Sequence, residues 1–344
     1  MKIAILNDTH FGVRNDSPLF LDYFFDFFEN QFFPYLKENN IKTILHLGDF
    51  MDRRKFVNFN TLSSVKNRFF DPLSKLDIDF HMLIGNHDTY YKNTNEINSP
   101  NELFSDFKFF NLYEKPTTVT FENLKIGMIP WICANNENEV LDYLKTCSCD
   151  LICGHFELTG YEMSRGNKFM GGMSDKCLKR FETVLSGHFH NKSHNKNVRY
   201  LGTQYQITFA DANETKGFHV LDTETKELDF IENTNRIFYV LNSEDISSSD
   251  EFDYLENKYI KLIVSSETTK KDIDAIVSKI ENSNPYDLNV LEDFTSSNLD
   301  TSCVDLSKDT ITIINEEIDN LENDVNKDLL KKLTRELFLE ALDL

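Results

Sequence analysis

Short runs of apolar residues recur along the first two thirds of the chain, and a polar loop follows each of them. Runs of this length between polar segments predict buried β-strands. After the first run, Ser17 and Pro18 precede a dense series of Phe and Leu up to residue 39, and a Ser N-cap followed by Pro is typical of a helix start. The predicted strands cover residues 3–6, 43–47, 80–84, 126–129, 150–153 and 183–185.

The order strand, helix, strand predicts parallel pairing and an α/β core in which helices cover sheets. In such folds, ligands bind beyond the carboxyl ends of the strands. Functional side chains are therefore expected directly after the predicted strands.

Side chains that bind metals do follow these strands. Five of the nine histidines lie in the strand-end loops, and three of the loops also supply Asp or Asn. Mixed oxygen and imidazole ligands suit Mn²⁺, Fe or Zn²⁺ better than Ca²⁺. The ordered clustering predicts one shared metal site. In chain order, the loops contribute Asp8 and His10; Asp49; Asn86, His87 and Asp88; His155; and His188 and His190.

This ordered set of motifs resembles the calcineurin-like metallophosphoesterase superfamily. The resemblance implies an α/β fold, a two-sheet sandwich flanked by helices, with two divalent metal ions at the strand ends. It also implies that the ions are Mn²⁺, with Mg²⁺ as a weaker substitute. By the resemblance, the first metal binds Asp8, His10, Asp49 and His190, and the second binds Asp49, Asn86, His155 and His188, so that Asp49 bridges.

His87 has no metal in this scheme. The resemblance places it at the phosphate, where it steadies the transition state or protonates the leaving oxygen. Asp88 is expected to accept a hydrogen bond from the His87 ring and fix its tautomer, or else to cap a turn. Asp52 either supports a metal ligand or is an ordinary loop acid.

Further segments resemble the nuclease branch of the superfamily, which includes SbcD, the Mre-eleven nuclease and related phage recombination endonuclease subunits. This resemblance implies a DNA nuclease subunit with 3′–5′ exonuclease and single-strand endonuclease activity in recombination, repair and replication. Gln204 stands where relatives often have Pro, so the nearby loop is expected to differ. The segments are residues 48–55, 84–93, 115–119, 129–131 and 198–203.

Basic residues beside the motifs suit a polyanionic substrate, although each is equally compatible with a solvated loop charge. The chain as a whole has a formal charge of −21, and most of the acidic excess lies in residues 236–344. Unaided DNA binding is therefore expected to be weak and to fall steeply with salt, and a partner is expected to hold the DNA. The candidate phosphate-binding residues are Arg53, Arg54, Lys55, Lys192, Lys196 and Arg199.

The last third of the chain has a different texture. The polar segments 243–253 and 296–302 predict linkers, residues 259–264 alternate like a strand, and residues 269–280 form an amphipathic helical pattern. We predict a metallophosphoesterase nuclease domain at 1–235, a small α+β capping and DNA-binding domain at 236–295, a linker at 296–309 and a helical segment at 310–344.

Two short helices, at residues 311–321 and 329–342, are predicted to bury apolar stripes. The family resemblance implies that they bind the coiled coil of an SbcC / Rad-fifty type ATPase, and that the chain forms a homodimer. The alternatives are that the helices pack on their own domain or dimerise.

Composition adds exclusions. With 40% hydrophobic and 27% charged residues and only 12 Gly and 7 Pro, the 344-residue chain is globular. No apolar run is long enough to span a bilayer, so a cytoplasmic protein is expected, in the host cytoplasm if a phage encodes it. Two other functions stay open: a small-molecule or cyclic-nucleotide phosphodiesterase, which the extra C-terminal segments disfavour, and a structural clamp for the ATPase, which the complete ligand set disfavours.

Overall fold

A computed structural model of the chain describes residues 1–164, 167–247, 250–265 and 267–293, together with 318–319, 327 and 329–334. The chain divides into two compact units, Met1–Val264 with Thr268–Leu291, and Ser265–Glu267 with Glu292–Leu344. The predicted linker 296–309 and most of the two predicted C-terminal helices lie outside the described residues. The predicted domain boundaries therefore stay predictions.

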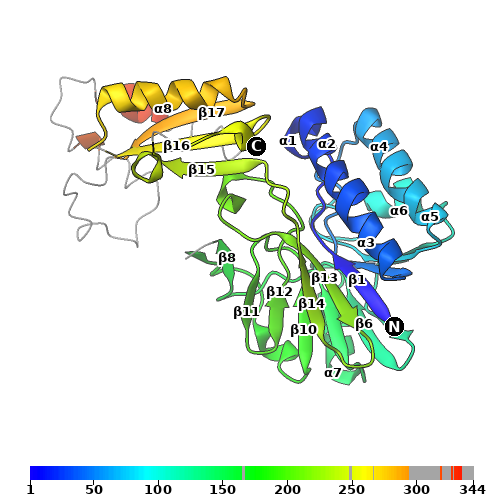
Figure 1. Cartoon of the computed structure of the whole chain (residues 1–344). Helices are drawn as coiled ribbons and strands as arrows, with labels where there is room; N and C mark the ends of the chain where they lie inside the picture. Colours follow the sequence, from blue (N-terminus) through cyan, green and yellow to red (C-terminus); the bar gives the residue numbers. More distant parts are fainter. Residues whose placement is uncertain are drawn as a thin grey trace. The chain divides into compact units, whose positions relative to one another are not determined.

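Two six-stranded sheets form most of the larger unit (Figure 1). The first sheet has the order β14 (Leu228–Glu232), β13 (Gly217–Asp222), β1 (Lys2–Leu6), β2 (Thr43–His46), β3 (Asp79–Leu83), β4 (Phe110–Tyr113). The second has the order β11 (Ser193–Asn195), β12 (Val198–Tyr200), β10 (Thr183–Ser186), β7 (Leu151–Gly154), β6 (Leu124–Ile129), β5 (Thr117–Phe121). Strands β1 to β4 are parallel, as are β6, β7, β10 and β12. The predicted α/β core is confirmed, and all six predicted strands are present within two residues of their predicted ends.

The residues of β1 alternate between two cores, as the period of two along a strand requires. Ile3 and Ile5 pack between the two sheets with residues such as Leu45 and Ile126. Ala4 and Leu6 point to the opposite face, where they join a phenylalanine-rich core under the helices. The first sheet is therefore buried on both faces at β1.

The helices lie mainly over the outer faces of the sheets. In the described part of the chain, no helix combines the length and the apolarity needed to cross a membrane. The α-helices are α1 (Val13–Asp16), α2 (Pro18–Phe27), α3 (Phe33–Glu38), α4 (Phe59–Val65), α5 (Asp71–Lys75), α6 (Ser99–Phe104), α7 (Glu137–Thr146) and α8 (Lys270–Asn282). Short 3₁₀ turns are η3 (Asp175–Leu178), η4 (Phe209–Asp211), η5 (Ser243–Asp245) and η6 (Asp253–Leu255).

The helix predicted from Pro18 to residue 39 is present but not uniform. A π-helical turn, η1 (Phe28–Phe32), separates α2 from α3, and a second, η2 (Lys66–Phe70), separates α4 from α5. Both turns come directly before a proline-containing first turn, with Pro34 or Pro72. Because proline has no N–H and its ring excludes the carbonyl four residues before it, a wider turn accommodates it. Ser17 occupies the N-cap position, but its side chain forms no capping hydrogen bond.

A third, three-stranded sheet has the order β15 (Phe238–Asn242), β16 (Tyr259–Ser265), β17 (Asp287–Asp293), and α8 packs on it. The predicted strand at 259–264 and the predicted helix at 269–280 are confirmed. The prediction that residues 243–253 are too polar to pack is wrong for Phe252, which is buried with Leu255 in the core of this sheet. A two-stranded hairpin, β8 (Glu162–Ser164) and β9 (Asn167–Lys168), completes the strands.

Candidate metal centre

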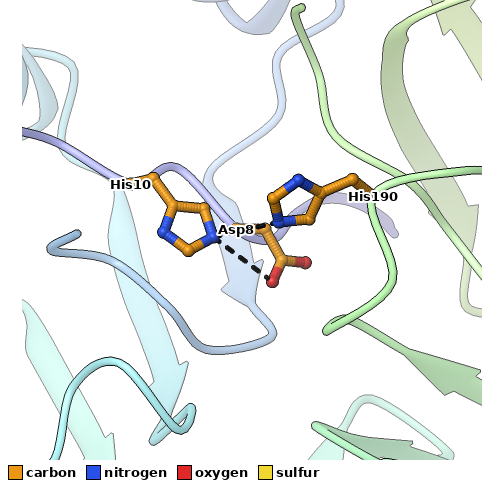
Figure 2. A group of neighbouring side chains, drawn as sticks. All are labelled: Asp8, His10 and His190. Carbon is orange, nitrogen blue, oxygen red and sulfur yellow. Dashed lines mark hydrogen bonds and ion pairs between the residues drawn. The ribbon is translucent and has the colours of Figure 1, made fainter. Parts of the chain in front are cut away.

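The loops after β1, β2 and β3 of the first sheet and those after β7 and β10 of the second sheet converge. Figure 2 shows Asp8 and His10, which follow β1, pointing toward His190, which follows β10. The described Asp and His side chains form three overlapping groups. Within each group, the candidate ligand atoms lie within 4.8 Å of one another. The groups are Asp8, His10 and His190; His10, Asp49 and His87; and Asp49, His155 and His188.

The first cluster is built around two imidazole nitrogens. His10 Nε2 lies 3.1 Å from His190 Nε2 and 4.0 Å from Asp8 Oδ1. The carboxylate of Asp8 accepts the backbone N–H of His188 at 3.0 Å and the side-chain amide of Asn7 at 2.6 Å. The backbone thereby fixes Asp8 while its carboxylate faces the histidines.

The second cluster is built around an amide oxygen. Asn86 Oδ1 lies 2.9 Å from both His155 Nε2 and His188 Nδ1. Asp49 Oδ2 lies 3.3 Å from His155 Nε2 and 3.8 Å from His10 Nε2, so it stands between the two clusters. This is the position that the bridging role predicted for Asp49 requires.

The second cluster fits a cation. His155 Nδ1 lies 2.7 Å from the carbonyl oxygen of Leu47, which can only accept, so Nδ1 carries the proton and neutral His155 has a lone pair on Nε2. That lone pair faces the oxygens of Asn86 and Asp49, and acceptors are brought together only by a proton or a metal. Ligands bound about 2.1 Å from one ion in adjacent positions lie roughly 3 Å apart, which matches these separations.

Close approach of the loops requires glycine at two positions. Gly48 has φ +89, and a Cβ on it would lie 2.7 Å from the backbone of Gly85 and from His155 Nδ1. A Cβ on Gly85 would lie 2.2 Å from Asp49 Oδ1. Non-glycine residues of the site are also left-handed, with φ of 50 at Asp8, 45 at His10, 58 at Asp49 and 88 at His188.

The carboxylates favour protonated histidines when no metal is bound. Burial lowers the pKa of His10, but the hydrogen bond to Asp52 and the charges of Asp49 and Asp8 outweigh burial and raise it to about 9. Burial also lowers the pKa of His155, but the charges of Asp49 and Asp8 outweigh burial and raise this pKa to about 9. Burial and the neighbouring His10 lower the pKa of His190 to about 4.

We expect metal binding to release protons. With pKa values of about 9, His10 and His155 carry a proton on both ring nitrogens at neutral pH in the metal-free chain. The ring nitrogen that binds the metal must lose its proton. The apparent affinity for Mn²⁺ should therefore rise as the pH increases toward about 9 and level off above it. Titration calorimetry in two buffers of different ionisation enthalpy measures the protons released. Identical enthalpies in both buffers would contradict the prediction.

Comparison with known proteins decides the family. A family model described as calcineurin-like phosphoesterase matches residues 1–192. The chain belongs to the calcineurin-like phosphoesterase family. It is 36% identical over 295 residues to exonuclease subunit 1 of Enterobacteria phage T4, covering 82% of this chain and 86% of that protein.

More distant likenesses to solved structures accompany this family match. An archaeal phosphodiesterase is 16% identical, with a TM-score of 0.33, over 68% of this chain and 100% of that one. GAP50, described as the anchor in the inner membrane complex of Plasmodium, is 16% identical, with a TM-score of 0.40, over 69% of this chain and 90% of that one. Both are too distant to bear on function.

The phosphoesterase site orients His87 through Asp52, not through Asp88. His87 Nδ1 lies 2.6 Å from the backbone carbonyl oxygen of Asp52, so Nδ1 is the donor and Nε2 has the lone pair in the neutral ring. The ring lies edge-on to His10, with 4.8 Å between centroids, and is half-buried beside both clusters. The predicted hydrogen bond from the His87 ring to Asp88 is wrong, because the ring N–H at Nδ1 donates to the backbone carbonyl of Asp52.

Asp88 instead joins the loops after β2 and β3. Its carboxylate is fully buried and accepts the backbone N–H groups of Gly85 and Asp49 at 2.8 Å and that of Phe50 at 2.9 Å, with Met51 at 3.4 Å. Burial and the charge of Asp49 raise its pKa to about 7, whereas the N–H donors favour the ionised form. Asp88 therefore positions Asp49, which is closer to the predicted turn-capping alternative.

Replacing Asp88 with Ala should lower the free energy of unfolding by about 3 kcal/mol, because buried backbone N–H groups lose their acceptor. Urea unfolding followed by circular dichroism measures the change. Asp142→Ala is the matched control, since its carboxylate is 76% exposed and, among the residues that the structure describes, pairs with Lys145 alone. Equal stability of the two variants would contradict the role given to Asp88.

The sequence analysis left the role of Asp52 open and did not identify two residues, Glu157 and Lys216, that contact candidate metal ligands. Asp52 Oδ1 lies 3.4 Å from His10 Nδ1, which favours the ligand-supporting alternative. Glu157 Oε1 lies 3.6 Å from His188 Nε2, and its signal was its place two residues after His155. Buried Lys216 donates to the backbone oxygen of His190 at 2.8 Å and pairs with Asp211 at 2.6 Å, and no local motif marks it.

The candidate phosphate-binding residues differ in exposure and in whether another side chain already binds their cationic group. Arg53 pairs with Asp16 at 3.4 Å and donates to Asn15, so it is already engaged. Arg54 Nη1 is buried without a hydrogen-bond partner in the described part of the chain. Lys55 is exposed, with its ammonium 5.5 Å from the centroid of the Tyr90 ring. Lys192, Lys196 and Arg199 are exposed after the last histidine pair.

Proposed function

We propose that the chain is the nuclease subunit of a DNA-processing enzyme of recombination, repair and replication, and that it hydrolyses phosphodiester bonds at a site for two divalent ions. The observation that carries the proposal is the pair of clusters joined by Asp49 Oδ2. The similarity to a phage exonuclease subunit supports a nucleic acid as the substrate. We propose 3′–5′ exonuclease and single-strand endonuclease activity.

Seven side chains would hold the two ions, and their mixture of oxygen and imidazole donors favours Mn²⁺ over Mg²⁺. When bound, the ions lower the pKa of a water and stabilise charge on the entering and leaving oxygens. The backbone holds the ligands in place: His188 N–H fixes Asp8, Leu47 carbonyl fixes His155, and Asp88 fixes the loop of Asp49. The proposed ligands are Asp8, His10, Asp49, Asn86, His155, His188 and His190.

His87 is proposed as the general acid. The Asp52 carbonyl occupies Nδ1, so Nε2 is the atom left to take up a proton and give it to the leaving oxygen. The His87 backbone N–H also donates to Asp49 Oδ1 at 2.7 Å, which fixes the ring relative to the clusters. Proton donation of this kind contributes roughly 10²–10⁴-fold to a rate.

The test is release of nucleotides from end-labelled single-stranded and duplex DNA by the purified full chain, in Mn²⁺ and in Mg²⁺. Hydrolysis of bis(p-nitrophenyl) phosphate is followed in parallel. We expect cleavage of DNA that is faster in Mn²⁺. Hydrolysis of the small ester with intact DNA, even when a coiled-coil ATPase partner is added, would favour the rival small-molecule phosphodiesterase.

The word subunit in the name of the T4 relative indicates that the relative works with another chain. We propose an SbcC / Rad-fifty type ATPase as the partner of this chain, bound through residues 310–344, and a homodimer of the nuclease, with 236–295 acting as the DNA-binding cap. Deletion of residues 311–344 should abolish co-purification with the ATPase. Retention of the ATPase by the truncated chain would show that these helices are not the contact.

A further inference from the structure

A basic pocket of about 360 Å³ lies at one edge of the sandwich, away from the metal ligands themselves. Its lining residues lie on or beside β11 and β12 of the second sheet and on β13 and β14 of the first, four strands that Figure 1 labels. Strands β11 and β14 each end their sheet, so the pocket lies beside an edge strand of both sheets. Lys192, Lys196 and Arg199 line it.

The cations of this pocket are not paired within its lining, although Glu232 and Glu214 act on Lys192 from outside it: burial lowers the pKa of Lys192, and the charges of these two carboxylates oppose that shift. No carboxylate is among the described residues that line it, and in the described part of the chain none of its three cations forms an ion pair. His219, also in the lining, is buried, and burial together with the charges of Lys192 and Arg199 lowers its pKa to about 4, so it is neutral. Cations gathered without an ion-pair partner are stabilised by a bound anion.

A polar atom in the pocket also lacks a partner. The hydroxyl oxygen of Ser193 is buried and has no hydrogen-bond partner among the described residues. A buried hydroxyl without a partner costs free energy unless a ligand or water supplies the bond. Ser193 is the first residue of β11 and follows Lys192 in the chain, and both residues line the pocket.

Aromatic surface accompanies the charge. The ammonium of Lys192 lies 3.3 Å from the centroid of the Phe230 ring, and the His219 ring lies 5.2 Å from the same ring. Cations beside aromatic rings are typical of surfaces that bind single-stranded nucleic acid, where phosphates meet the charges and bases meet the rings. A bare inorganic anion would not require the aromatic part.

The pocket is linked to the proposed nuclease site by residues that are close in the sequence. Lys192 comes two residues after His190, and Lys216, which holds the backbone of His190, directly precedes β13. We propose that this pocket binds a backbone phosphate, with its neighbouring base, of the DNA strand whose scissile bond lies at the metal centre. The inference rests on the proposed nuclease function and adds a second, metal-free contact to it.

The test uses the full chain and the double variant Lys196→Ala/Arg199→Ala, which leaves the loop of His190 untouched. Lys37→Ala/Lys75→Ala is the matched control, because it removes the same charge from exposed lysines on α3 and α5. Binding of a fluorescent single-stranded oligonucleotide is measured by anisotropy between about 50 and 200 mM salt. Thermal unfolding of each variant checks that the fold is kept.

The double variant should bind the strand roughly tenfold more weakly than the control, and the magnitude of the slope of log affinity against log salt should fall by about 0.7, the value for one lost phosphate contact on a single strand. Binding and slope equal to those of the control would overturn the pocket while leaving the nuclease proposal intact. Weakened binding with no cleavage by the parent chain in Mn²⁺ would support the pocket and overturn the nuclease. If the parent binds no strand even at about 50 mM salt, the pocket fails, and the nuclease proposal is then judged by cleavage alone.

Discussion

Replacing Asp49 with Asn should reduce hydrolysis by at least about 10³-fold, which corresponds to roughly 4 kcal/mol of transition-state stabilisation. Asp49 Oδ2 is the oxygen that lies near both clusters, at 3.3 Å from His155 Nε2 and 3.8 Å from His10 Nε2. An amide in its place cannot bridge two cations. Its N–H₂ group would instead donate to the lone pair of His155 and satisfy the cluster without metal.

The substitution affects only the oxygen between the two clusters, because Asn keeps an oxygen in place of Asp49 Oδ1. Asp49 Oδ1 accepts the backbone N–H of His87 at 2.7 Å, and an Asn oxygen can accept the same bond. The fold should therefore survive while bound metal is lost. Metal content by mass spectrometry, together with turnover of DNA and of bis(p-nitrophenyl) phosphate, measures both effects. Asp142→Asn is the matched control. A variant that keeps two ions and full turnover would exclude the bridging role.

Replacing His87 with Ala should lower kcat for DNA by roughly 10²–10⁴-fold while leaving the metal content unchanged. The reason is geometric: the Asp52 carbonyl occupies Nδ1, so only Nε2 can pass a proton to the leaving oxygen. A p-nitrophenolate leaves without a proton, so the loss should be much smaller for bis(p-nitrophenyl) phosphate than for DNA. The comparison of the two substrates separates proton transfer from positioning.

Two outcomes would argue against this role of His87. Equal losses on both substrates would indicate that the ring positions the phosphate and does not protonate the leaving oxygen. Loss of metal in His87→Ala would indicate that the ring is a ligand, a result made plausible by the grouping of His87 with His10 and Asp49.

The residues of the metal centre could be predicted from the sequence because each directly follows a buried strand. Parallel strands of one sheet bring their carboxyl ends together, so Asp8 after β1 and Asp49 after β2 were expected to approach each other once the strands were identified, whereas the meeting of the two sheets at one site was implied by the family resemblance. The apolar runs alone identify those strands. The α/β class and the convergence of the loops within each sheet follow from the same local pattern.

The partners of the supporting residues could not be predicted in this way. Asp88 is next to His87 in the chain, yet its carboxylate points at backbone N–H groups of the loop after β2, a choice made by how the two loops pack. Lys216 reaches His190 from a segment that carries no motif. Such contacts depend on tertiary placement, which periodicity and spacing do not encode.

The left-handed backbone at Asp8, His10, Asp49 and His188 also limits which substitutions the site tolerates. A non-glycine residue in that conformation costs roughly 1 kcal/mol or more, which glycine avoids. At Asp8 and Asp49, however, glycine would also remove a buried carboxylate that accepts a backbone N–H. The backbone cost is therefore tied to the side chains that build the site, so that neither can be removed without the other.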